Sequence, residues 1–185
     1  MSAQANAIPF TRDRTLVGIV LFIGSESLFF LSLVIAFLVF RDQGLATAKA
    51  QLDVGRTAVF SVLLFSSSGT MGRAAGRRSR LWLGLTALLG TVFLAGQGLE
   101  YARLLGAGLR PASGLFGTTF FTLTGLHAVH VAVGLGLLAT LFAASTARPR
   151  RIGNTAWEGI AMYWHFVDAV WAVVFSVVYL GTLIG

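Results

Sequence analysis

Cysteine is absent from the 185-residue sequence, and histidine is scarce, with three residues in the whole chain. Without cysteine the chain can form no disulfide, and it offers no thiolate to a zinc ion or an iron–sulfur cluster. Three histidines also leave few ligands for a haem or for a metal ion held by imidazole. These two features exclude the cysteine-based classes of site and restrict the metal-based ones.

Charged residues are also few. They make up 11% of the chain, less than half of the usual share of about 25% in soluble proteins, while hydrophobic residues make up 56% and the mean hydropathy is +0.80. The apolar residues are too many for one soluble core of this size, and they gather in long runs. The composition therefore indicates an integral membrane protein. The net charge of +7 comes mostly from arginines between these runs, which is typical of membrane topology, so we expect no nucleic acid partner.

Five runs are long enough to cross a bilayer, which takes about 20 mostly apolar residues. We predict an all-α integral membrane protein with one membrane domain, residues 1–185, folded as an up-down bundle of five transmembrane helices with short connections. The predicted spans are residues 16–40, 54–71, 81–99, 116–142 and 160–184. The second span is short and contains Ser66-Ser67-Ser68, so its ends are the least well defined.

The distribution of basic residues predicts an orientation. With the N-terminus in the cytoplasm, nine basic residues lie on the cytoplasmic side and five on the other. The nine are Arg12, Arg14, Arg73, Arg77, Arg78, Arg80, Arg148, Arg150 and Arg151, and the five are Arg41, Lys49, Arg56, Arg103 and Arg110. Because short cytoplasmic loops carry the excess of basic residues, we expect a cytoplasmic N-terminus and a C-terminus on the outer, periplasmic side.

Several polar side chains fall within or near the predicted spans, where an ionisable group costs at least about 2.5–3.5 kcal/mol. They are Glu26, Gln97, Glu100, His127, His130, Glu158, His165 and Asp168. Their spacing places His127 and His130 on one helical face, and Glu158, His165 and Asp168 on another. A proton relay or a metal site could use such faces. Hydrogen bonds between helices, from inside the bundle, explain the histidines and Asp168 more simply, and for Glu26 both explanations stay open.

A haem site finds little support in these positions. His127 and His130 lie on one face of one helix and cannot ligate opposite sides of one iron, although either could do so together with His165. We therefore expect no haem in this chain.

Four stretches of the sequence resemble motifs of one known protein family. The stretch Glu158-Gly-Ile-Ala-Met-Tyr-Trp-His-Phe-Val-Asp-Ala-Val-Trp171 resembles the last-helix signature of that family. The stretch Phe120-Phe-Thr-Leu-Thr-Gly-Leu-His-Ala-Val-His130 is similar to the preceding helix, where Thr-Gly-Phe-His-Gly-Leu-His is typical. Gly96-Gln-Gly-Leu-Glu-Tyr101 looks like the family's Gly-Gln-x-x-Glu-Tyr, and Ser25-Glu-Ser-Leu-Phe-Phe30 looks like its Ser-Glu-x-Met-Phe-Phe. Together the four motifs resemble subunit III of the haem–copper respiratory oxidases, and the resemblance runs from about residue 16 to residue 184.

The resemblance implies a short, five-helix bacterial form of subunit III in the bacterial inner membrane. Larger members have seven helices, with lipids held between the first pair and the remaining five, and this chain matches the five. By motif match, Glu26 is implied to be a buried carboxyl near the lipid cleft, and we place Trp164 and His165 there with it. His127, His130, His165 and Asp168 are implied to form a polar set between helices.

The resemblance also implies a function without redox chemistry in this chain. It implies no catalytic, cofactor-binding or metal site here, with haem and copper held by subunit I, and it allows a bound phospholipid. Subunit III would pack on subunit I, beside subunit II and other oxidase subunits, stabilise it and support proton uptake while oxygen is reduced to water. We favour cytochrome c as the electron donor. Quinol oxidases carry the same subunit, so a quinol is the second choice.

Two other functions stay open at this point. One is the related accessory protein found beside some nitric oxide reductases, whose members carry aspartate where Glu26 stands. The other is a free-standing channel or transporter that uses Glu26 and the histidines. The absence of an inverted repeat and of a broken helix from the sequence pattern disfavours the transporter.

Overall fold

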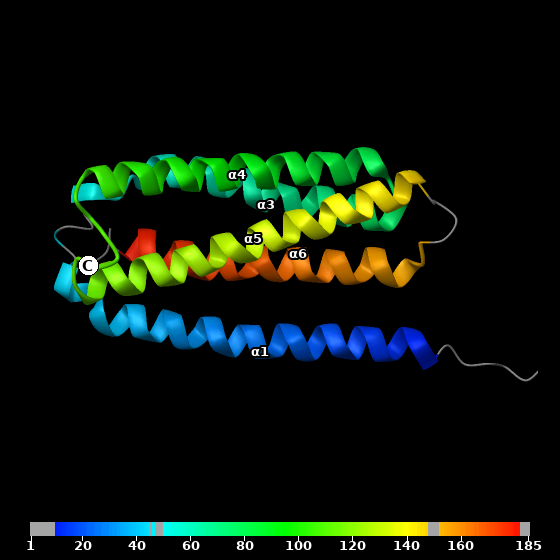
Figure 1. Ribbon diagram of the computed structural model, residues 1–185, viewed down its shortest axis with the longest axis horizontal. Coiled ribbons are helices and arrows are strands. Elements are labelled where there is room, and N and C mark those ends of the chain that lie inside the picture. Colours follow the sequence, from blue (N-terminus) through cyan, green and yellow to red (C-terminus); the bar gives the residue numbers. More distant parts are fainter. Residues whose placement is uncertain (1–9, 45, 47–49, 148–151, 182–185) are drawn as a thin grey trace, which may run out of the picture.

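The computed structural model describes residues 10–44, 46, 50–147 and 152–181, and the regular structure in them is entirely helical. Five long helices run alternately up and down along one axis (Figure 1). They are α1 (Phe10–Phe40), α3 (Val54–Arg77), α4 (Arg80–Gly106), α5 (Leu115–Ala147) and α6 (Asn154–Phe175). A 3-10 turn, η1 (Arg41–Gly44), follows α1, and a π-helical turn, η3 (Ser176–Leu180), continues α6. The prediction of an all-α bundle of five helices is confirmed.

The helices form three layers. Helices α3 and α4 pack along each other, α5 and α6 lie in the middle, and α1 packs on the far side of α5 and α6 (Figure 1). Helix α6 touches α3, α5 and α1, and α5 touches α4, α6 and α1, so these two helices form the centre of the bundle. Only 11% of the most apolar stretch of α1 is buried inside the chain, against 44% for α6. Helix α1 therefore leaves most of its surface for lipid or for another polypeptide.

Four of the helical segments are long and apolar enough to cross a membrane, judged by length and composition. They are Arg14–Gly44, Arg80–Gly106, Leu115–Ala147 and Asn154–Leu180. Helix α3 has 24 residues, which gives it a length of about 36 Å, but it is less apolar than the other four. The membrane crossing of α3, expected for residues 54–71, therefore stays a prediction.

The helices extend past the apolar runs from which they were predicted. Helix α6 begins at Asn154 rather than at residue 160, and α4 continues to Gly106 rather than to residue 99. The reason is that backbone hydrogen bonding continues beyond the apolar core into the polar interface. Helix α3 ends where Arg78 adopts a left-handed conformation (φ 48°) and the Ser79 N–H bonds the Ala74 carbonyl at 3.1 Å. The predicted end of the last span, residue 184, lies outside the described residues.

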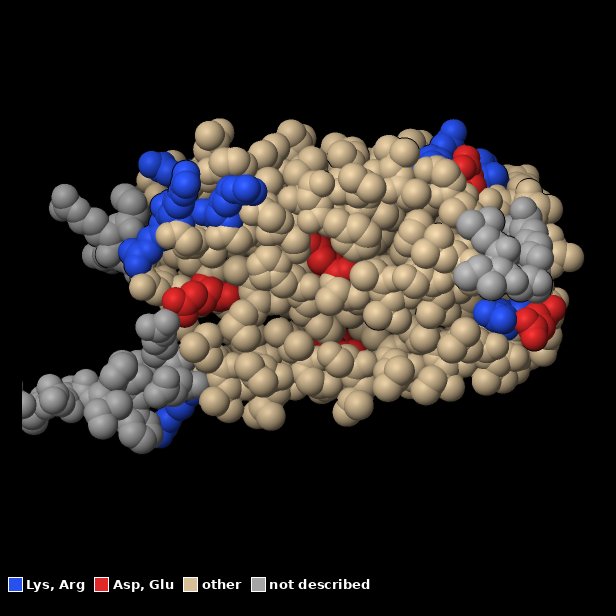
Figure 2. All heavy atoms as spheres, turned by 180° about the vertical axis from the view of Figure 1, so that it is seen from behind, with Lys and Arg blue, Asp and Glu red and all other residues tan. Residues whose placement is uncertain are grey.

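Charge is distributed along the bundle in a simple way. Figure 2 shows Lys and Arg atoms gathered near the two ends of the molecule, with a tan band of uncharged residues between them and some acidic atoms halfway along. The turn between α3 and α4 lies at the same end as the start of α1 (Figure 1). The arginine-rich turn and the N-terminal end of α1 therefore share one side, as the orientation argument requires.

The polar side of α3 faces the bundle, which explains its lower hydropathy. Ser61 and Ser67 are buried, and their hydroxyl oxygens accept hydrogen bonds from two indoles of α6, Trp171 Nε1 at 2.8 Å and Trp164 Nε1 at 2.9 Å. Its outward side carries apolar residues, among them Val59 and Val62. Bonds between helices satisfy polar groups that lipid cannot. Helix α3 thus turns hydroxyls toward the bundle among its buried apolar residues, and exposes valines on its outer side.

Two glycines make room for a tryptophan at the centre of the bundle. Trp164 is fully buried, and a Cβ atom added to Gly90 of α4 or Gly134 of α5 would come within 2.6 Å or 2.9 Å of its ring. The indole therefore occupies space that both helices leave by lacking a side chain. These contacts join α4, α5 and α6 at one point.

A matched pair of substitutions in α4 tests this packing. We expect Gly90→Ala to lower the free energy of unfolding by about 1–2 kcal/mol, because overpacking outweighs the gain in helix propensity. Gly98 is exposed on the same helix and has nothing within 4 Å of an added Cβ, so Gly98→Ala should be neutral or slightly stabilising. Unfolding by SDS titration in mixed micelles measures both. Equal effects of the two changes would contradict the packing role of Gly90.

Candidate functional site

The polar residues singled out from the sequence occupy several separate places in the bundle. The first joins α1 to α5, where Glu26 Oε2 lies 3.2 Å from His130 Nε2. The other ring nitrogen, Nδ1, is 2.8 Å from the Leu126 carbonyl oxygen, which can only accept, so Nδ1 carries a proton. The contact between Nε2 and Oε2 then holds one further proton, on either the carboxyl or the imidazole. The Tyr163 hydroxyl, from α6, donates to the His130 carbonyl at 3.0 Å.

This pair is half-buried and has an aromatic neighbour. The Glu26 and His130 side chains are 23% and 16% exposed, and the edge of the Phe30 ring lies against the imidazole with centroids 5.0 Å apart. The carboxyl is therefore mostly covered by the chain, with part of it open at the surface. The arrangement can hold a proton and can fasten α1 to α5.

The second place joins α3 to α6. Ser68 Oγ lies 2.9 Å from His165 Nδ1 and also donates to Asp168 Oδ2. Asp168 is buried, and its Oδ1 finds no partner within the described residues, whereas His165 is exposed. The sequence predicted that both residues act from inside the bundle, which is wrong for His165. Residues three apart on a helix differ in direction by about 60°, so one can face inward while the other faces outward.

The order of these groups differs from that of a nucleophilic triad. In such a triad the histidine stands between the serine and the carboxylate and removes the serine's proton. Here Ser68 stands between His165 and Asp168 and bonds to both. The cluster therefore links two helices and lacks the arrangement of a nucleophilic triad.

The third place is an aromatic stack around His127. The imidazole is fully buried and stacked on Trp171, with ring centroids 4.8 Å apart and planes 25° apart, and the edge of Phe93 packs against it. Neither ring nitrogen has a hydrogen-bond partner in the described part of the chain. We expected a hydrogen bond between helices at this position, and the structure shows an aromatic contact instead. His127 and His130 point to different neighbours, α6 and α1.

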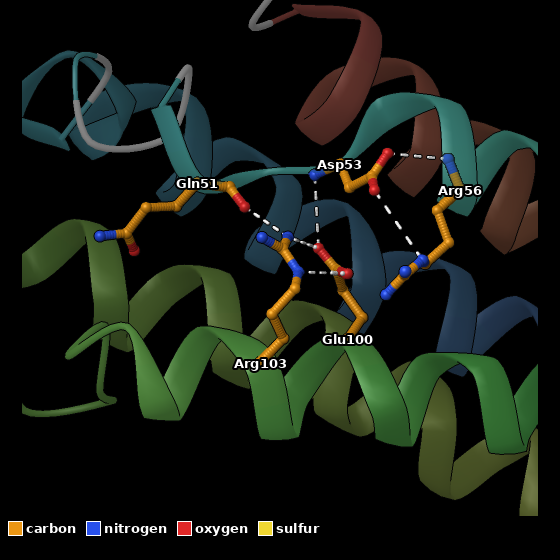
Figure 3. Close-up of polar contacts among 5 residues, drawn as sticks. All are labelled: Gln51, Asp53, Arg56, Glu100 and Arg103. Atoms are coloured by element: carbon orange, nitrogen blue, oxygen red, sulfur yellow. Dashed lines mark hydrogen bonds and ion pairs between the residues drawn. The ribbon is translucent and has the colours of Figure 1, made fainter.

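The fourth place is the end of α4 (Figure 3). Glu100 is buried and bonds Arg103, with Oε1 2.5 Å from Nη2 and Oε2 3.1 Å from Nε. Arg103 also donates to the Gln51 carbonyl, and the Asp53 N–H donates to Glu100 Oε1 at 3.4 Å. Asp53 in turn caps α3 by accepting the Arg56 N–H at 2.9 Å. Glu100 thus fastens the segment that starts α3 onto α4.

Sequence reasoning missed two members of this network. Arg103 was considered only for its charge, although it lies three residues after Glu100, a spacing at which side chains on a helix meet. Asp53 directly precedes an apolar run, which is a helix-start signal that could have identified it as a cap. Both signals are local and readable, but the contacts of Arg103 with Gln51 and of Asp53 with Glu100 depend on the fold.

The remaining predicted residues stand apart from these groups. Gln97 is buried in α4, and its Nε2 lacks a partner within the described residues. Glu158 lines a small hollow at the start of α6 with Gly76 and Arg78. Trp164 is enclosed at the centre of the bundle, so it cannot line a lipid cleft, and His165 faces α3 while Glu26 faces α5. The structure therefore does not bring Glu26, Trp164 and His165 together.

The described residues contain no group of three or more His, Asp or Glu side chains placed to hold a metal ion. The polar side chains instead make pairs and short chains between neighbouring helices. Chemically they can fasten helices and, at Glu26 and His130, hold a proton.

A charge substitution tests the network around Glu100. We expect Glu100→Gln to lower the free energy of unfolding by about 1–3 kcal/mol, because Arg103 loses its charged partner and the Asp53 N–H a strong acceptor. Asp42→Asn is the control, since Asp42 pairs with Arg41 at an exposed position and such pairs contribute about 0–1 kcal/mol. SDS titration measures both, and an equal loss in the two variants would contradict the fastening role of Glu100.

Comparison with known proteins agrees with the motifs. Residues 67–182 match the family described as cytochrome c oxidase subunit III. Cytochrome c oxidase subunit 3 of a Synechocystis species is 39% identical over 181 residues, which cover 91% of this chain and 76% of that protein. The Bacillus subtilis protein of the same description is 34% identical, covering 99% of this chain and 94% of that protein.

A quinol oxidase subunit is also among the relatives. Subunit 3 of the cytochrome bo(3) ubiquinol oxidase of Pseudomonas aeruginosa is 33% identical, covering 90% of this chain and 85% of that protein. The resemblance stated from the four motifs is thereby confirmed. The chain belongs to the cytochrome c oxidase subunit III family of the haem–copper oxidases.

Proposed function

We propose that this chain is the non-redox structural subunit of a proton-pumping terminal oxidase in a bacterial inner membrane. In this role it packs on the haem- and copper-bearing subunit I, stabilises it, and supports proton uptake while oxygen is reduced to water. Subunit II and further oxidase subunits complete the complex. The N-terminus lies in the cytoplasm and the C-terminus on the periplasmic side, as the distribution of arginines suggests.

The observation that carries the proposal is how the chain uses its polar side chains. Glu26 bonds His130, Ser68 bonds Asp168, and Trp171 bonds Ser61, each pair joining two helices of the same chain. A transporter keeps polar groups and unwound backbone around a substrate site near the bilayer midplane. The described parts of α1, α4 and α5 are continuous helices through their whole apolar length. Because these polar side chains bond to other helices of the same chain, they favour a scaffold over a transport path.

A lipid-binding role is supported by a groove between α1, α5 and α6. The groove has a volume of about 770 Å³, and its lining is mostly apolar. It is lined by Thr15, Gly18, Ile19, Phe22, Val133, Leu137, Gly153, Thr155, Ala156, Gly159, Ile160 and Tyr163. We propose that it holds an acyl chain of a phospholipid, because α1 touches its neighbours loosely there and lipid can fill the remaining space.

Cytochrome c is the proposed electron donor. Most of the similar proteins named above are cytochrome c oxidase subunits, and the ubiquinol oxidase subunit makes a quinol the second candidate. The donor site would lie in another subunit, so residues of this chain do not choose between the two.

Purification of the intact complex tests the function. A tag on this chain should co-purify haem and copper from gently solubilised membranes, and the preparation should oxidise reduced cytochrome c. Oxidation of a quinol but not of cytochrome c would replace the donor and keep the family role. A colourless preparation that contains only this chain would contradict the proposal.

Two substitutions at one position separate fastening from proton transfer. Glu26→Gln keeps an oxygen and an N–H for His130, whereas Glu26→Ala removes both. If the pair only fastens α1, the Gln variant should match the unmodified complex in proton uptake and in the number of turnovers before inactivation, and the Ala variant should inactivate several-fold sooner. Proton uptake reduced equally in both variants, with haem content unchanged, would contradict a purely structural pair.

A further inference from the structure

The outer surface along α3 and α6 carries an exposed imidazole deep in the apolar band. His165 lies 11 residues after the start of α6 and 15 before Leu180, or about 16 Å and 22 Å along a helix. Its Nδ1 bonds Ser68, while its Nε2 makes no hydrogen bond within the described part of the chain. Hydrocarbon tails cannot bond this nitrogen, so the site is unfavourable if lipid covers it.

Small residues flank the imidazole on α3. Ser68, Gly72 and Gly76 follow at steps of four, and a Cβ added to Gly72 or Gly76 would meet nothing within 4 Å. Gly90 and Gly134 differ, because the chain's own Trp164 fills the space beside them. Gly72 and Gly76 therefore pack against nothing in the described part of the chain, yet each costs about 1 kcal/mol relative to alanine in a helix.

Helix α6 continues the same surface with exposed small residues. Ala172 and Ser176 lie seven and eleven residues after His165, so all three share one stripe of the helix. Beneath the imidazole, Asp168 is 95% buried, and its Oδ1 lacks a partner within the described residues. Ser68 connects this carboxyl to His165, so the polar chain runs from the interior to the outer surface.

We propose that this α3–α6 face, formed by Ser68, Gly72, His165 and Ala172, is the docking surface for a transmembrane helix of the haem-bearing subunit. That helix would carry a hydrogen-bonding side chain, such as a hydroxyl, an amide or a carboxyl, at the depth of His165. The small residues let its backbone approach closely, and His165 Nε2 supplies a bond at the midplane. The inference rests on the proposed function for the identity of the partner and adds the face, the depth and the chemistry of the contact.

A second copy of this chain fits the face less well. Two copies with the same orientation in the membrane would meet about an axis along the membrane normal, so the same end of α3 would approach its counterpart. That end carries Arg73, Arg77 and Arg78, all exposed, and like charges would be brought together. A different polypeptide avoids this repulsion.

Site-specific crosslinking tests the face in native membranes. Because the chain has no cysteine, Gly72→Cys and Gly98→Cys each introduce the only thiol in it, both at exposed positions with open space beside them. A thiol-reactive benzophenone at residue 72 should give an adduct with the haem-bearing subunit at several-fold higher yield than at residue 98. A yield at residue 98 equal to or above that at residue 72, or adducts of residue 72 only with lipid or a second copy, would overturn the proposal.

Substitution of the imidazole gives an independent reading. If lipid covered the face, His165→Leu would leave retention of the chain unchanged or raise it, since leucine is apolar and is favourably placed in hydrocarbon. With a polar partner helix there, His165→Leu should lower retention of the chain in the detergent-washed complex several-fold, and His165→Gln should restore most of it. Retention of the Leu variant at the unmodified level would contradict the docking surface. Failure of the proposed function is distinguished by a different result, the absence of haem from the purified unmodified complex.

Discussion

A bilayer offers no water to a hydroxyl, an amide or an indole, and the position of helix α3 depends on how the chain meets that constraint. Helix α6 supplies the partners: Trp164 bonds Ser67, Trp171 bonds Ser61, and Asp168 bonds Ser68. Interhelical bonds of this kind average about 0.6 kcal/mol each in membrane proteins, so the three together contribute about 2 kcal/mol. Leaving the same groups unpaired in hydrocarbon would cost considerably more, which makes α3 and α6 a unit.

The rest of the bundle is arranged around this unit. Helices α4 and α5 approach closely because Gly90 and Gly134 leave room for Trp164, and Glu100 fastens the start of α3 to the end of α4. Helix α1 differs, since its main contacts among the described helices are with α5 and α6, with Glu26 and His130 as a polar pair there. Helices α3 to α6 therefore enclose most of the buried core, whereas α1 lies at the edge with little of its surface buried, beside the apolar groove. A scaffold beside a redox-active subunit needs the first property, and lipid binding is helped by the second.

Much of the fold could be predicted from the sequence, because apolar runs and their spacing are direct consequences of membrane thickness. The five helices and their up-down order follow from residues 16–40 and the four later runs. Helix ends could not be predicted in this way, since α6 begins at Asn154 in the polar interface where hydropathy gives no signal. The four motifs identified the family, because a membrane helix needs only apolar residues. The specific polar and aromatic residues of Glu158–Trp171 and of the other three motifs are not required by composition.

The candidate site was less predictable, since spacing assigns residues to a helical face but does not say which neighbour that face meets. Asp168 points inward and His165 outward, although they are three residues apart. His127 could not be recognised as an aromatic stacker without the position of Trp171. The serines Ser66–Ser68 made the second span look weakly defined, and two of them join it to α6, since Ser67 accepts from Trp164 and Ser68 donates to Asp168.

A double-mutant cycle between Trp171→Phe and Ser61→Ala, measured by SDS titration of the protein in mixed micelles, tests the central claim most directly. The phenylalanine keeps most of the buried ring, and the alanine keeps the helix, so the cycle isolates the bond between indole and hydroxyl. The account predicts that the two losses of unfolding free energy are not additive, with a favourable coupling of about 0.6–1.7 kcal/mol. Strictly additive losses, with a coupling near zero, would contradict it.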